Sequence, residues 1–376
     1  MIFKVRVIIA FAGLFLIFSS VQAQLLTDTL AQQQIKQALD KIYNFEFASA
    51  ERMITTVQKR YPRHPVSPML QALYISWKHY PMDTRSQAYV TYQHYLREAL
   101  EKNKTTFGED TSNPEGIFFA LSAHSYLSLV AAEEKDYMKA LSEAKKTYAF
   151  MKEGFDLMNK FPEFFFSTGL YNYYVVQYPE NHSVVKPFMF FFTDGNKELG
   201  LQQMEKSIHR GVFTRTEACY WLAHIYIKHD FKLQKALHYT QLLINKYPAN
   251  SQYVMRHAEM LVANGKYEQA QPFIQQLLAQ QNKMFHGAAY IFQGIIQEKG
   301  VKNHALARLN YQKAFTLGLN DKRYTKDYYA QAYAGLARIA DKEGNKQSAR
   351  EYYKKTLELA EYESTIREAK NYLKNA

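Results

Sequence analysis

Apolar residues recur along this 376-residue chain at steps of three and four, the spacing of one face of an α-helix. Several of these helix-period runs end near a proline, as at Pro62, Pro162, Pro179 and Pro248. Glycine and proline are otherwise scarce, with 15 and 10 in the whole chain, and no alternation of apolar and polar residues persists. The pattern therefore predicts an all-α protein.

The predicted helices also resemble one another at a fixed spacing. Small residues stand where two helices of a pair must approach closely, and Ala236, Ala270 and Ala307 follow one another at 34 and 37 residues. A partner helix upstream of each second helix carries its own small residue. These partner residues are Gly169, Ala223, Ala258, Gly294 and Ala337.

This spacing resembles the tetratricopeptide repeat, a helix–turn–helix unit of about 34 residues. The resemblance covers nearly all of the chain after residue 23, and agreement between several registers disfavours a generic helical bundle. It implies an α-solenoid of tetratricopeptide-like helix–turn–helix repeats. We expect divergent repeats at 24–102, central repeats at 117–213 and a C-terminal array at 214–376. The polar stretch 103–116 either joins two hinged halves or belongs to one continuous superhelix.

One central repeat carries an apolar insertion, expected at 176–195, because Gly169 and Gly200 are 31 residues apart where about 12 are expected. Exposing five large apolar side chains there would forgo roughly 7–15 kcal/mol of burial. We expect them to plug the interior of the solenoid, on a short helix begun by Pro187. A partner protein or a membrane interface is the alternative. The side chains are Phe188, Met189, Phe190, Phe191 and Phe192.

The central segment has a second resemblance. Residues 165–210, with "GLYNYY" followed by "KPFMFFF" and "KELGLQQMEKS", look like the middle of the tetratricopeptide family that includes the inclusion-body-clearance protein and mitochondrial outer-membrane relatives. That family has Gly-Asp-Arg where this chain has Asp194-Gly195-Asn196-Lys197. The resemblance implies the same architecture with its insertion, and no function is carried over. Asp194 or Asn196 is expected to cap the helix that follows.

Residues 1–23 have the pattern of an export signal. Lys4 and Arg6 precede an apolar core at 7–18, and a small-residue cleavage pattern ends at Ala23. The core is shorter than the roughly 20 residues that span a bilayer, although retention as an N-terminal anchor stays an alternative. We therefore expect an exported protein, in the bacterial periplasm or at the cell envelope.

The composition of the chain limits the classes of partner that we expect. The one cysteine, Cys219, excludes an intrachain disulfide and lies in an apolar run, where we expect a buried, unreactive thiol. Lysine and arginine number 47 against 35 aspartates and glutamates, a net charge of +12 that favours acidic partners such as lipid headgroups, glycans or acidic proteins. Nucleic acid is disfavoured for an exported chain.

Signatures of catalysis are missing from the sequence. It has no nucleophile elbow, phosphate loop, dinucleotide fingerprint or His-Glu-x-x-His zinc motif. We therefore expect no enzymatic activity, no cofactor and no metal site.

Aromatic residues are abundant, with 30 tyrosines and 25 phenylalanines. Many are expected to fill seams between helices, and the rest to line the concave face formed by the first helices of the repeats. That face predicts a groove of mixed aromatic and polar character, suited to a peptide segment or a carbohydrate. The candidate groove residues are Phe166, Tyr173, Tyr220, His224, Met255, Glu259, Ile291, Glu298, Arg338 and Asp341.

These observations predict a non-enzymatic scaffold or adaptor that mediates protein–protein interactions at the cell envelope. The alternative is a helical-repeat protein that binds envelope lipid or glycan through its basic, aromatic-rich surface. The sequence leaves the partner and the oligomeric state open.

Overall fold

The structure is a computed structural model, and in the part of the chain that it describes every regular element is a helix. It describes residues 25, 28–108, 113–181, 186–187, 189–190, 192–317 and 322–375, without the side chains of residues 181 and 322–324. The expected export signal at 1–23 lies outside the described residues. Phe188 and Phe191 of the apolar insertion also lie outside them.

The helices follow one another in chain order with short connections. The first half of the chain contains α2 (Thr29–Tyr43), α3 (Phe47–Arg60), α4 (Val66–Lys78), α5 (Gln87–Phe107), α6 (Pro114–Glu133), α7 (Tyr137–Leu157), α8 (Phe164–Asn181) and α9 (Lys197–Arg210). The second half contains α10 (Arg215–Lys228), α11 (Leu233–Lys246), α12 (Ser251–Ala263), α13 (Tyr267–Leu278), α14 (Lys283–Ile295), η2 (Ile296–Val301), α15 (His304–Thr316), α16 (Lys322–Lys342), α17 (Lys346–Leu359) and α18 (Glu363–Asn375).

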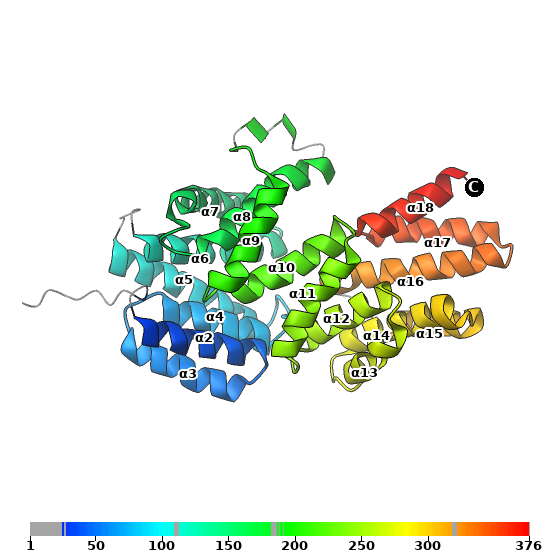
Figure 1. Cartoon of the computed structure of the whole chain (residues 1–376), viewed down its shortest axis with the longest axis horizontal. Helices are drawn as coiled ribbons and strands as arrows, with labels where there is room; N and C mark the ends of the chain where they lie inside the picture. Colours follow the sequence, from blue (N-terminus) through cyan, green and yellow to red (C-terminus); the bar gives the residue numbers. More distant parts are fainter. Residues whose placement is uncertain are drawn as a thin grey trace, which may run out of the picture.

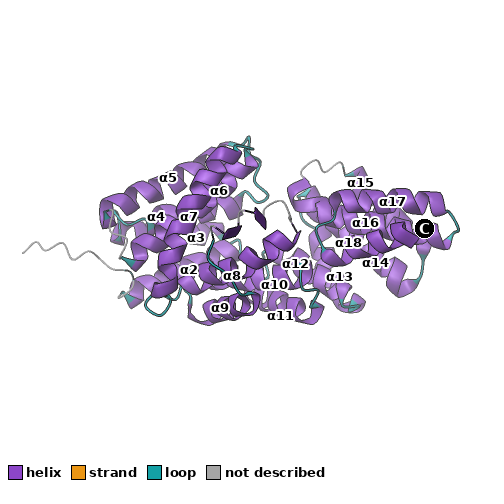
Figure 2. Ribbon diagram, turned by 90° about the horizontal axis from the view of Figure 1, so that it is seen from above, coloured by secondary structure: helices purple, strands orange, loops and turns teal. Residues whose placement is uncertain are grey.

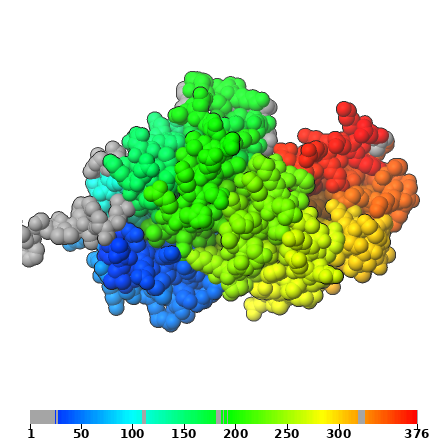
Figure 3. Space-filling model, in the orientation of Figure 1, coloured from blue at the N-terminus to red at the C-terminus, as the bar shows by residue number. Residues whose placement is uncertain are grey.

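Each helix packs most closely against its neighbour in the chain, so that the helices form successive antiparallel pairs from α2–α3 to α16–α17, followed by α18. The pairs α2–α3 to α6–α7 lie together at one end of the molecule, α8–α9 and α10–α11 follow in the middle, and the later helices lie toward the other end (Figures 1 and 2). The same succession is visible on the surface (Figure 3). The described chain is thus an all-α solenoid, which confirms the predicted fold class.

Asparagine side chains begin many of these helices. Asn250, for example, accepts hydrogen bonds from the backbone N–H groups of Gln252 and Tyr253 at 3.0 and 3.2 Å. Such a cap satisfies donors that have no partner within the helix. The other asparagine caps are Asn113, Asn196, Asn282, Asn303 and Asn345. Asn196 is one of the two residues that the sequence predicted as the cap of its helix.

Small residues lie where the two helices of a pair cross, as predicted. An added Cβ on Gly169 would lie 2.8 Å from the carbonyl oxygen of Gly200, and one on Gly200 would lie 2.5 Å from that of Gly169. Ala258 and Ala270 are both fully buried at the equivalent crossing of α12 and α13. The backbones therefore approach more closely than larger side chains would allow.

The apolar insertion differs from the expected interior plug. Helix α8 continues to Asn181, five residues past the expected start of the insertion, which carries the segment beyond the packed hairpins. Phe190 is 76% exposed and Phe192 is 40% exposed, while Met189 is half-buried. Phe192 contacts the ring of Tyr148 at 5.1 Å between centroids. The described side chains of the insertion therefore lie on the surface.

Helix α7 differs from the register that its sequence predicts. Tyr137, Ala140, Ala144 and Thr147 follow one another at steps of three and four, which predicts that they form the inward face of the helix. In the structure Tyr137 is 70% exposed and Ala144 is exposed. Met151 and Gly154 are the buried residues of this helix instead. Gly154 permits the ring of Phe164 to approach, since an added Cβ would lie 2.5 Å from it.

The described residues of the stretch 103–116, which was expected as a possible hinge, lie mostly in helices. Helix α5 continues to Phe107, Asn113 caps α6, and the two helices pack against each other. Helix α6 is long and apolar enough to cross a membrane by length and composition, but 61% of its apolar window is buried inside the protein. It is accordingly a core helix of the solenoid.

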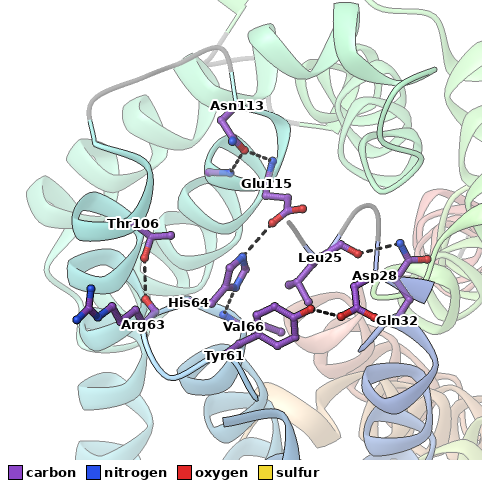
Figure 4. A network of polar contacts seen from close by, with 11 residues as sticks. Leu25, Asp28, Gln32, Tyr61, Arg63, His64, Val66, Thr106, Asn113 and Glu115 are labelled. Atoms are coloured by element: carbon purple, nitrogen blue, oxygen red, sulfur yellow. Dashed lines mark hydrogen bonds and ion pairs between the residues drawn. The ribbon is translucent and has the colours of Figure 1, made fainter. Parts of the chain in front are cut away.

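A network of polar contacts lies where the start of α4 meets the start of α6 (Figure 4). His64 accepts a hydrogen bond at Nδ1 from the backbone N–H of Val66 at 3.1 Å. The Nε2 atom of His64 therefore carries the ring proton and donates a hydrogen bond to Glu115 at 3.0 Å. Both side chains are buried. This contact ties the start of α4 to the start of α6 across two hairpins.

The solenoid turns back on itself, so that its first hairpin contacts α10 to α12. Tyr247 donates a hydrogen bond from its hydroxyl to Asp40 at 2.7 Å, and Arg215 pairs with the same carboxylate. The Asn250 side chain donates to the backbone carbonyl of Tyr43 at 2.8 Å. Residues about 170 to 210 positions apart in the chain are thereby joined, and the turn encloses a cavity.

Candidate binding cavity

The inner face of the closed turn lines a cavity of about 430 Å³. Its walls come mainly from α4, α6, α10, α12 and α16, the first helices of their hairpins, and its volume lies in the range of small-molecule and peptide sites. The lining residues are Leu73, Ser76, Trp77, Tyr80, Met82, Tyr89, Tyr92, Tyr126, Leu129, Val130, Glu133, Glu217, Tyr220, His224, Gln252, Arg256, Lys326, Asp327 and Tyr328.

Aromatic side chains dominate one end of the cavity. The ring of Trp77 lies 5.7 Å from that of Tyr80, 5.7 Å from that of Tyr43 and 5.6 Å from that of Tyr253. Edge-to-face and offset contacts of this kind hold the rings in fixed orientations. Glu217 lies close to Tyr43, Tyr126 and Tyr253, and its carboxylate accepts a hydrogen bond from the Tyr43 hydroxyl at 2.8 Å.

Charged side chains gather at the other end. Arg256 pairs with Glu259 at 3.0 Å and donates to the Tyr362 hydroxyl at 2.7 Å. The backbone N–H of Glu361 donates to Asp327 at 2.7 Å. Burial raises the pKa of Asp327 to about 6, although the nearby Arg256 lowers it. This end therefore combines paired positive charge with a carboxylate that takes up a proton near pH 6.

Two polar side chains on the wall have atoms without a hydrogen-bond partner among the described residues. They are the Oε1 atom of Gln252 and the Nδ1 atom of His224. Burial and the charges of Arg256 and Lys228 hold the pKa of His224 well below its usual value, so this ring is neutral. Because buried polar groups are nearly always satisfied in native proteins, these atoms mark a place where a ligand or water completes the contacts.

The structure brings only part of the predicted groove together. Tyr220 and His224 lie on the cavity wall, with ring centroids 6.5 Å apart, and Glu259 lies behind it in its ion pair with Arg256. Tyr173, Met255 and Ile291 are buried in the core and present no surface to a partner. The remaining predicted residue of the central repeats, Phe166, packs against the core and is half-buried.

The predicted groove residues of the C-terminal repeats are used in contacts within the chain. Arg338 donates two hydrogen bonds to Glu298, at 2.6 and 2.9 Å, and Tyr311 donates to the same carboxylate at 2.7 Å. Asp341 pairs with Lys346 at 2.5 Å and accepts from the Tyr372 hydroxyl at 2.6 Å. These residues therefore join neighbouring helices in the structure.

The sequence reasoning missed most of the cavity. Glu217 was detectable, since it lies three residues before Tyr220 and shares its helix face. Gln252 and Arg256 were detectable by the same spacing on α12. Trp77 gave no such signal, because its place in the cavity depends on the closure of the turn. Among the described residues, no group of three or more His, Cys, Asp or Glu side chains is placed to hold a metal ion.

No family model matches the sequence, and no curated protein sequence matches it. Solved structures that are similar include a tetratricopeptide repeat protein from Parabacteroides merdae, with 16% identity, a TM-score of 0.34 and coverage of 80% of this chain and 98% of that chain. Another is a human IFIT1 dimer with m7Gppp-AAAA, with 13% identity, a TM-score of 0.37 and coverage of 91% and 97%.

A third is the C-terminal part of a TPR repeat-containing protein from Cytophaga hutchinsonii, with 15% identity, a TM-score of 0.26 and coverage of 89% and 98%. At these values the similarities carry no argument about ligands or partners. The architecture is established by the helices of the chain itself, which pair in succession and cross at small residues. The chain therefore has a tetratricopeptide-like helical-repeat fold.

Proposed function

We propose that the protein is an exported, non-enzymatic adaptor that holds other proteins at the bacterial cell envelope, with the inner cavity receiving a segment of the partner. The proposal places the protein in the compartment indicated by the export pattern of residues 1–23. An interaction role fits a repeat fold, whose curvature creates extended inner binding surfaces.

The observation that supports this role most directly is the cavity of about 430 Å³ on the inner face of the turn. Rigid aromatic side chains supply contact area at a low cost in conformational entropy. The unpartnered Oε1 of Gln252 supplies a directional contact. A peptide segment of a few residues, with apolar and polar side chains, matches both features.

The test is crosslinking and mass spectrometry in the native cell envelope, with the full chain as bait. Ser76→Trp places a bulky ring in the cavity, since Ser76 lines it on α4. Thr55→Trp on the exposed face of α3 is the matched control, because both hydroxyls donate only to a backbone carbonyl of their own helix.

We expect specific partners to be crosslinked to the wild-type chain and to Thr55→Trp, and to be lost with Ser76→Trp. An unaltered partner set with Ser76→Trp, in a protein whose unfolding temperature is preserved, contradicts the role of the cavity. An empty partner set for the wild-type chain contradicts the adaptor function itself.

A second candidate function is binding to an envelope lipid surface. It is favoured by the exposed side chains of Phe190 and Phe192 beside the exposed Lys186, a combination that suits an anionic interface. Co-sedimentation with phosphatidylglycerol vesicles tests it. Phe190→Asp is expected to abolish sedimentation without changing the unfolding temperature, and sedimentation equal to the wild type contradicts this function.

A further inference from the structure

The carboxylate of Glu217 has an unusual position among the charged groups of the cavity. It lines the cavity in the part of the chain that the structure describes, and no lysine, arginine or histidine there forms an ion pair with it. Its carboxylate accepts a hydrogen bond from the neutral hydroxyl of Tyr43. Burial raises the pKa of Glu217, because the aromatic surroundings solvate its charge poorly.

The cations of the same cavity are already compensated by other carboxylates. Arg256 pairs with Glu259. Lys326 and, behind it, Lys228 at 2.6 Å share Glu361, and both also act on the nearby carboxyl group of Asp327. The positive groups are therefore held at the end formed by α12 and α16. The charge of Glu217 is left for a group that enters the cavity.

The rings around Glu217 favour a positively charged guest. Trp77, Tyr126 and Tyr220 all line this cavity, and the faces of aromatic rings carry a negative electrostatic potential that attracts cations. Desolvation strengthens this attraction. An aromatic enclosure with one uncompensated carboxylate accordingly selects an organic cation over an anion or a neutral sugar.

Gln252 narrows the class of cation. It is 4% exposed, and its Oε1 atom, an acceptor, has no partner among the described residues. Its Nε2 atom donates to the Tyr220 hydroxyl at 3.5 Å. A guest that satisfies both the carboxylate of Glu217 and this amide oxygen must donate hydrogen bonds, which a primary ammonium does and a quaternary ammonium does not.

We propose that the Glu217 end of the inner cavity binds a primary ammonium group, held by the Glu217 carboxylate, the Gln252 amide oxygen and the faces of the surrounding rings. This inference rests on the proposed function, because it specifies what the entering segment carries. The ammonium belongs to a lysine side chain of the partner or to a free alkylamine, and the chemistry of recognition is the same.

The test is isothermal titration calorimetry with the full chain and three probes: Nα-acetyl-lysine methylamide, cadaverine, and the neutral Nα,Nε-diacetyl-lysine methylamide. Glu217→Gln removes the charge and keeps an oxygen that can accept from Tyr43. Glu205→Gln is the matched control, since the Glu205 carboxylate also accepts from a tyrosine hydroxyl, that of Tyr239, but does not line the cavity. The unfolding temperature of each variant checks its fold.

We expect both amines to bind the wild-type chain and Glu205→Gln, and to bind Glu217→Gln roughly 10- to 100-fold more weakly, as for the loss of a hydrogen bond to a charged group. The neutral probe should bind all three weakly and equally. Tighter binding of the lysine derivative than of cadaverine assigns the ammonium to a polypeptide, and the reverse order assigns it to a free amine.

Equal amine affinity of the wild type and Glu217→Gln overturns the proposal. So does the absence of amine binding to the wild type. If partners are still lost with Ser76→Trp in that case, the adaptor function stands and only the ammonium site is refuted. If Ser76→Trp also keeps its partners, the role of the cavity fails as well.

Discussion

Replacement of Glu163 tests how the solenoid is joined at its centre. This residue precedes α8, is 2% exposed, and accepts four hydrogen bonds from the segment before α10. The donors are the backbone N–H groups of Val212 at 2.6 Å, Phe213 at 3.1 Å and Thr214 at 2.9 Å, and the Thr214 hydroxyl at 2.7 Å. The carboxylate thereby satisfies donors that would otherwise be buried without an acceptor.

The magnitude follows from the number of donors. Glu163→Ala leaves three N–H groups without an acceptor, since the Thr214 hydroxyl still has the Ser207 hydroxyl at 2.9 Å, and each unsatisfied buried group costs about 1–3 kcal/mol. Water entering the vacated space compensates part of this, so we expect a loss of about 3–5 kcal/mol in local stability. Glu163→Gln keeps one acceptor oxygen and should cost about 2 kcal/mol.

Hydrogen exchange measured by mass spectrometry is the suitable assay, because a repeat array need not unfold in one step and a single melting temperature would mix its parts. For Glu163→Gln we expect the amides of residues 212–214 to exchange roughly 30-fold faster, the rate equivalent of about 2 kcal/mol. Exchange in α17 should not change. Glu153→Gln on the exposed face of α7 is the matched control.

This reasoning would be refuted if the amides of residues 212–214 in Glu163→Ala exchanged within about twofold of their wild-type rates. It would mean that these donors find other acceptors at no cost. A uniform acceleration over all helices would also contradict it, because the four hydrogen bonds join only the start of α8 to the start of α10.

Three further predictions concern separate sites. Gly294→Ala should lower stability by about 1–3 kcal/mol, measured by thermal unfolding, because the new methyl group would lie 2.5 Å from the buried ring of Tyr311; an unchanged unfolding temperature contradicts this. The pKa of Asp327 is raised to about 6 in the folded state, so its contribution to stability falls as pH rises from about 4 to about 6. Asp327→Asn should therefore increase the free energy of unfolding by on the order of 1–2 kcal/mol near pH 7.5 and change it little near pH 4.5. Equal effects at the two pH values contradict this prediction. Cys219 is buried and its pKa is raised to about 12, so it should resist a thiol reagent such as DTNB until the protein unfolds, whereas rapid labelling of the folded chain contradicts its burial.

Local features of the fold were predictable from the sequence. Small residues such as Ala258 and Ala270 mark helix crossings because only a small side chain allows close approach, and this constraint acts within one hairpin. The cap at Asn196 is local for the same reason. The face of α7 was predicted wrongly, because the inward position of Gly154 depends on the ring of Phe164 in the next hairpin.

The cavity depends on contacts that no local pattern records. Tyr220 and His224 were predicted for the inner face because they lie one turn apart on α10. Trp77 and Tyr126 reach the same cavity from hairpins more than 90 residues earlier. Their proximity to Glu217 results from the curvature accumulated over several repeats, and small rotations at each hairpin interface determine that curvature.

Closure of the turn and the chemistry of the cavity are physically connected. Tyr43, on the first hairpin, donates to Glu217 on the cavity wall, while Asp40 on the same helix accepts from Tyr247 and pairs with Arg215. These long-range contacts hold the first hairpin against α10 to α12, and α10 and α12 form part of the cavity wall. A ligand that binds the closed turn more tightly than an opened one must therefore stabilise these contacts, by an amount set by its concentration relative to its dissociation constant. For such a ligand, occupancy of the cavity and closure of the turn are linked quantities.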